Sequence, residues 1–118
     1  MKNIIFLITA FCLFVSSVSF AEPTTDQLAT EGKVMYSEGR YQAAISVLEK
    51  AVNDRPTHGL ATYYLALSYI RTGKKEQAII LLEVYLERVN QENVQLTELD
   101  KEYIPKNEDL LTYATTKL

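Results

Sequence analysis

One segment of this chain occurs twice, 34 residues apart. The sequence GRYQAAISVLEKA at residues 39–51 returns as GKKEQAIILLEVY at residues 73–85. The shift aligns glycine with glycine and small or apolar residues with their like. The aligned pairs are Gly39 and Gly73, Ala44 and Ala78, Ile45 and Ile79, and Leu48 and Leu82. A repeat of this length is typical of folds that stack one supersecondary unit on the next.

Within and around the two copies, apolar and small residues recur every three or four positions, as they do on one face of a helix. Glycines and prolines are sparse and fall between these runs. Thr24 and Gln27 have the spacing of a capping box at the start of the first predicted helix. The pattern predicts an all-α chain with helices at about residues 25–38, 41–54, 57–72 and 75–90, arranged as two antiparallel hairpins.

The period and the residues together resemble the tetratricopeptide repeat, a helical hairpin of 34 residues. The first copy supplies Leu28, Glu31, Gly32 and Met35, then Ala44, Leu48, Ala51 and Pro56. The second supplies Thr62, Leu65, Ala66 and Tyr69, then Ala78, Leu82 and Tyr85. The resemblance covers about residues 25–92 and implies two repeats, at about 25–58 and 59–92. The departures are Glu31 for Leu, Thr62 for Trp and Asn90 for Pro.

The matched residues have mechanical roles. We expect small residues where the helices of a hairpin cross, because larger side chains would push the helices apart. These are Gly32, Ala44, Ala66 and Ala78. Gly39 and Gly73 are expected to end their helices in the left-handed backbone conformation.

Residues 93–118 follow the repeats and allow two interpretations. Asn107 is a candidate N-cap after Pro105, which is expected to end an earlier segment. A degenerate third hairpin would then cap the exposed end of the second repeat, since isolated pairs of repeats are seldom stable. The alternative is a disordered acidic tail.

The first 21 residues have the order of a secretory signal peptide: Lys2, an apolar run, then small residues ending at Ala21. Cleavage there would leave a single domain of residues 22–118. Cys12 lacks the context of a lipid-modified cysteine. The alternative is an uncleaved anchor, since the run is near the lower limit for a membrane span. The expected destination is the periplasm of a bacterium, with an extracellular destination left open.

The chain without these residues has no cysteine and, having lost Lys2, carries 11 basic against 15 acidic residues, a net charge of −4. This balance argues against nucleic acid or anionic lipid as a partner. The sequence contains no phosphate loop and no metal-binding spacing. His58 is expected at the surface of the turn between the repeats. We therefore expect no enzyme, no metal and no cofactor.

The resemblance implies a partner-binding groove lined by the first helix of each repeat. The inferred groove positions are Asp26, Ala29, Lys33, Tyr36 and Ser37 in the first copy, and Leu60, Tyr63, Leu67, Ile70 and Arg71 in the second. Leu60, Tyr63, Leu67 and Ile70 form an apolar stripe. Either the C-terminal segment covers this stripe, or it is an open groove edged by Lys33 and Arg71. Ala29 and Tyr64 stand where some family members place carboxylate-clamp residues, so that clamp is not expected.

Two functions are consistent with these features. The first is an exported, non-catalytic module that holds a partner protein or peptide, with candidate contacts at Lys33, Tyr36, Leu60, Tyr63, Leu67, Ile70 and Arg71. The second is a structural protein that associates with copies of itself or with a larger envelope assembly.

Overall fold

The computed structural model describes residues 21–118, so the predicted signal peptide lies almost wholly outside the described residues. The described part is all-α. Its helices are α2 (Thr25–Ser37), α3 (Tyr41–Asp54), α4 (Gly59–Arg71), α5 (Lys75–Val89) and α6 (Glu98–Thr116). The first four agree with the predicted helices within two residues at each end. None of these five helices is long and apolar enough to cross a membrane.

The helix ends follow the sequence signals. The Thr24 hydroxyl accepts from the Gln27 backbone N–H and the Gln27 side chain accepts from the Thr24 N–H, which confirms the capping box. Gly39 and Gly73 have φ angles of 77° and 78°, in the left-handed region where glycine is favoured. These glycines close the turns of the two hairpins, α2 with α3 and α4 with α5.

Small residues allow the hairpin helices to pack closely, as predicted. A Cβ atom added at Gly32 would lie 2.3 Å from Cγ of Leu48, so α2 and α3 could not keep their separation with a larger residue there. Ala44, Ala66 and Ala78 are completely buried. Each hairpin is therefore held by an apolar seam of residues spaced three or four apart.

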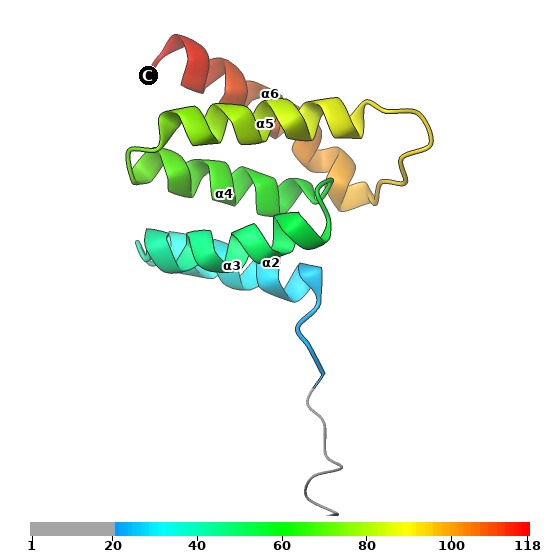
Figure 1. The fold of residues 1–118 in the computed structure, drawn as a ribbon, viewed down its shortest axis with the longest axis horizontal. Coiled ribbons are helices and arrows are strands. Elements are labelled where there is room, and N and C mark those ends of the chain that lie inside the picture. The colour runs from blue at the N-terminus through cyan, green and yellow to red at the C-terminus, as the bar shows by residue number, and fades with distance from the viewer. Residues whose placement is uncertain (1–20) are drawn as a thin grey trace, which may run out of the picture.

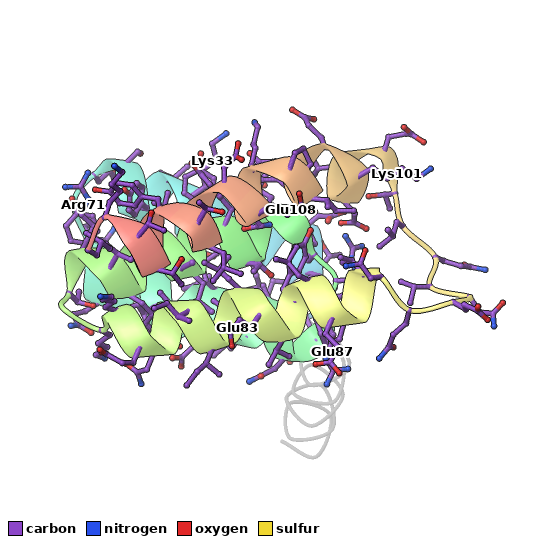
Figure 2. The ribbon with its side chains drawn as sticks, turned by 90° about the horizontal axis from the view of Figure 1, so that it is seen from above. Lys33, Arg71, Glu83, Glu87, Lys101 and Glu108 are labelled. Carbon is purple, nitrogen blue, oxygen red and sulfur yellow. The ribbon has the colours of Figure 1, made fainter. Side chains whose placement is uncertain are left out.

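The helices form two layers (Figures 1 and 2). The α2, α4 and α6 helices lie in one layer, and α3 and α5 lie in the other. The α4 helix contacts both α2 and α3, and α6 contacts both α4 and α5 in the same manner. The α6 helix thus has the position that the first helix of a third repeat would have.

The C-terminal segment differs from the predicted hairpin. It is one helix, α6, with Pro105 inside it, and Asn107 lies within this helix instead of capping a second one. The start of α6 is capped by Thr97, whose hydroxyl accepts from the Asp100 N–H. Tyr103, Asn107, Leu110 and Ala114 are buried along one side of α6. Packing of this side on α4 and α5 offsets the backbone hydrogen bond that a proline removes.

Candidate functional site

The candidate site lies on the layer made by α2, α4 and α6, which we call the three-helix face. Tyrosine rings cross this face from one helix to the next. The ring centroids of Tyr36 and Tyr64 are 5.5 Å apart, those of Tyr63 and Tyr64 are 5.3 Å apart, and those of Tyr63 and Tyr103 are 5.7 Å apart. Tyr41 adds a further ring, 5.3 Å from Tyr36. These distances are typical of favourable edge-to-face and tilted aromatic pairs.

We call these five residues, Tyr36, Tyr41, Tyr63, Tyr64 and Tyr103, the tyrosine row. Its members come from α2, α3, α4 and α6, so the row exists only when the repeats and α6 are stacked. Tyr103 is buried, whereas the other four are half-buried. Half-buried tyrosines present both an apolar ring and a polar hydroxyl, a combination that is enriched at protein interfaces.

Burial raises the pKa of Tyr63 and of Tyr103 above the ordinary value for tyrosine. Both hydroxyls therefore stay protonated near neutral pH. Tyr63 and Tyr103 therefore contribute rings and hydroxyl groups to the row but no charge.

Basic side chains stand beside the tyrosine row. Lys33 Nζ lies 5.8 Å from the centroid of the Tyr64 ring, within the range of a cation–π contact. Arg71 Nε donates a hydrogen bond of 3.4 Å to the Tyr36 hydroxyl, which raises the pKa of Arg71 further. Neither Lys33 nor Arg71 forms an ion pair with another residue of the described chain.

A third cation, Lys106, lies on α6. Its Nζ atom is 4.6 Å from the centroid of the Tyr103 ring and 3.7 Å from a carboxylate oxygen of Glu102. Because Glu102 offsets its charge, Lys106 contributes less free positive charge to the face than Lys33 or Arg71. Figure 2 shows Lys33 and Arg71 at separate places along the three-helix face.

A pocket of about 450 Å³ opens at the Arg71 end of this face, between α4 and α6. Its lining residues are Leu67, Ile70, Arg71, Leu110, Tyr113 and Leu118. Leu67 and Ile70 are only half-buried, and the Tyr113 side chain is 49% exposed. The pocket therefore combines aliphatic walls with a guanidinium group that is open to solvent.

The predicted contact residues differ in how far their side chains are exposed. Lys33 and Arg71 are exposed, and Tyr36, Tyr63, Leu67 and Ile70 are half-buried, so all six have surface to offer. Leu60 is a correction: only 9% of it is exposed, and it packs in the same apolar cluster as Tyr103. The C-terminal helix covers this end of the stripe fully and the other end in part, since Leu67 and Ile70 pack against the cluster that contains Leu110.

Two further groove positions also differ from expectation. Ala29 is 1% exposed and belongs to the core cluster that joins the first repeat to α4. Asp26 lies near the turn between the repeats, where its Oδ1 atom is 2.7 Å from Nε2 of His58. Ala29 thus lies beneath the tyrosine row, in the cluster on which Tyr36, Tyr63 and Tyr64 pack, and has almost no surface for a partner.

His58 is a second correction, because it is 1% exposed and not a surface residue. It is the N-cap of α4, and its Nδ1 atom accepts a hydrogen bond of 3.2 Å from the Ala61 N–H. With Nδ1 as the acceptor, Nε2 carries the proton that is donated to Asp26. The ring therefore fastens α2 to the start of α4, which is a structural role.

An ion pair completes this junction. The Arg55 guanidinium donates a hydrogen bond of 2.8 Å to the buried carboxylate of Asp100, whose other oxygen accepts from the N–H of the α6 N-cap, Thr97. Within residues 21–118, no group of three or more histidine, cysteine or acidic residues is placed to hold a metal ion. The junction pairs Arg55 Nη2 with Asp100 and His58 with Asp26, whereas Arg55 Nε is buried without a hydrogen-bond partner.

Sequence reasoning missed the contributions of Tyr41, Tyr64, Tyr103 and Lys106 to the site. Its one available signal was composition: the chain has eight tyrosines and no tryptophan. The position of Tyr103 could not be inferred, because α6 lies outside the repeat and its register on α4 depends on packing.

Comparison with known proteins agrees with the geometry. A family model described as tetratricopeptide repeat matches residues 35–99, which is more than half of the chain. Superkiller protein 3 of Saccharomyces cerevisiae is similar, with 33% identity over 66 residues, covering 55% of this chain and 5% of that protein. The chain thus corresponds to a small part of that relative. No solved structure matches the chain.

Proposed function

The chain belongs to the tetratricopeptide repeat family, whose repeats generally mediate protein–protein interaction, and from this we propose that it binds a segment of a partner protein on its three-helix face. The observation that carries the proposal is the tyrosine row with Lys33 and Arg71 beside it. Tyrosine and arginine, with tryptophan, are the side chains enriched at the energetic centres of interfaces. We propose no catalytic activity for this chain.

The geometry indicates how a partner would be held. A partner segment that crosses α2, α4 and α6 would pack apolar side chains on the tyrosine rings and would place one in the pocket between Leu67 and Leu110. Carboxylates on the segment would pair with Lys33 and Arg71, which are positive although the chain as a whole is acidic. Opposite local charge raises the association rate and fixes the register of the partner.

We further propose that the protein acts in the cell envelope, on the basis of the signal-like sequence of residues 1–21. The partner would then be an envelope or exported protein. A partner search therefore belongs in the envelope fraction of the producing cell, with the chain recovered as the cell processes it. A first residue of Glu22 in its mass spectrum would support this location, and recovery of the chain from the cytosolic fraction with its first segment retained would contradict it.

The test compares charge reversals on the two layers. Lys33→Glu and Arg71→Glu change exposed side chains of the three-helix face, whereas Lys50→Glu makes the same change on the exposed side of α3. We expect chemical cross-linking followed by co-purification to recover the same partner with the unchanged protein and with Lys50→Glu. The two face variants should recover at least about tenfold less of it, since each introduces like-charge repulsion in a complementary interface. Equal recovery with all three variants would reject the face as the binding site.

A further inference from the structure

The exposed side of the second helix of each repeat carries aliphatic residues in the second repeat and none in the first. In α5, Glu76, Ile80, Val84 and Arg88 follow one another at intervals of four residues, and all four are exposed. Residues at this spacing form a continuous row along a helix surface. Ile80 is 60% exposed and Val84 is 43% exposed. We call this set of four residues the α5 row.

The corresponding residues of the first repeat are all polar. The shift that aligns the repeats puts Gln42, Ser46, Lys50 and Asp54 of α3 at the positions of the α5 row, and these too are exposed. The fold therefore does not require apolar residues here, since the same helix position carries serine and lysine one repeat earlier. The two large aliphatic side chains of α5 are covered by no other element of residues 21–118.

The order of residue types in the α5 row is complementary to itself under a two-fold rotation. It begins with an acid, continues with two aliphatic residues and ends with a base. A second row turned by half a turn about the midpoint between Ile80 and Val84 places Ile80 of one copy beside Val84 of the other. The same rotation places Glu76 of each copy beside Arg88 of the other.

We propose that the α5 row is the contact surface for a second copy of this chain, related by a two-fold axis. A two-fold interface uses the same patch on both copies and must be self-complementary, which this order of residues satisfies. Rows of residues four apart pack between one another when two helices cross at about −50°. Glu76 and Arg88 form no ion pair within the described chain, so both are available for the second copy.

The surroundings of the row are compatible with this contact. Figure 2 shows Glu83 and Glu87 on the side of α5 that faces away from α6. The helix is therefore open to solvent on this side. The α5 row lies in the layer opposite the three-helix face, so a dimer formed through it leaves the partner-binding face free and presents two such faces.

The contact is small. Four side chains of one helix bury much less than the roughly 800 Å² per partner of a standard stable interface. The dimer is accordingly weak, and dimer and monomer exchange with concentration. Its effect is to double the number of three-helix faces when the protein is concentrated locally, which strengthens binding to a partner with repeated segments.

The experiment measures mass against concentration by sedimentation equilibrium, on the protein as the producing cell processes it. We expect the average mass to rise from the monomer toward twice that value. Glu76→Arg and Arg88→Glu alone should each weaken association at least about tenfold, because each places two like-charge pairs in the interface. The double variant Glu76→Arg/Arg88→Glu should restore association, since it exchanges the two charges and rebuilds both pairs.

A second variant tests the aliphatic centre. Ile80→Ser/Val84→Lys gives α5 the residues that α3 carries at the same positions, so the helix should fold, and circular dichroism checks that it does. This variant should be monomeric at all concentrations. A protein that is monomeric without any substitution, or one whose association is unchanged by these variants, would overturn the proposal. Either result leaves the partner-binding test on the three-helix face unaffected, because that test changes Lys33 and Arg71 only.

Discussion

The α4 and α6 helices approach each other closely at Gly59. A Cβ atom added there would lie 2.5 Å from Cβ of Tyr103 and 3.2 Å from the carbonyl oxygen of Asp100. The Gly59 carbonyl also accepts a hydrogen bond of 3.1 Å from the buried side chain of Asn107. Sequence analysis identified Gly32 as a crossing residue because the repeat supplied its partner. The role of Gly59 could not be predicted in the same way, because Tyr103 and Asp100, which it approaches, lie outside the repeat.

Replacement of Gly59 by alanine tests this contact, because the contact decides whether the substitution raises or lowers the stability of the protein. Glycine to alanine in a helix normally stabilises a protein by about 0.4 to 1 kcal/mol. Here the methyl group meets the backbone of α6, so we expect a loss of about 1 to 3 kcal/mol, as for other overpacked sites. Chemical denaturation monitored by circular dichroism measures the difference. The control is Gln42→Ala at an exposed helix position, which should change stability little.

A stability gain for Gly59→Ala would contradict the close packing of α4 and α6. A loss of similar size in Gln42→Ala would instead mean that the effect is not specific to this crossing.

At the scale of elements, four helices could be predicted and the fifth only in part. Periodicity, glycines and the capping box located α2 to α5 because each signal lies within the element it describes. Pro105 was interpreted as the end of a segment, since proline removes a backbone donor. In the structure α6 continues through it, because Tyr103 before the proline and Leu110 after it are both buried where α6 packs on its neighbours. Tertiary packing, and not a local sequence signal, therefore sets the extent of α6.

Removal of α6 tests its capping role. A chain ended after residue 92 uncovers the apolar surface of α4 and α5 that α6 buries. Large side chains contribute about 1.5 to 3 kcal/mol each when fully buried, and a small domain has only about 5 to 15 kcal/mol in total. We expect this chain to lose its cooperative thermal transition by circular dichroism, or to aggregate. A chain ended after residue 116 keeps α6 and should melt nearly as the full chain does.

If the chain ended after residue 92 melts at the temperature of the full chain, then α6 does not stabilise the repeats. The tyrosine row would then lose only Tyr103 on truncation, and α6 would belong to the binding surface alone.

The whole molecule presents different chemistry on its two layers. The three-helix face carries the tyrosine row, the pocket and the unpaired cations, and the opposite layer carries the α5 row. The predicted contacts on the first surface include Lys33, Tyr36 and Arg71, because the resemblance assigns groove positions within each repeat. The part formed with α6 could not be predicted, since it depends on where that helix packs.

Photo-crosslinking in the producing cell tests the central claim, partner binding on the three-helix face, most directly. A photoreactive side chain at position 33 samples the face beside the tyrosine row, and the same group at position 46 samples the exposed side of α3. We predict that position 33 gives a covalent adduct with one other protein and that position 46 does not. An adduct with that protein from position 46, with none from position 33, would contradict the account.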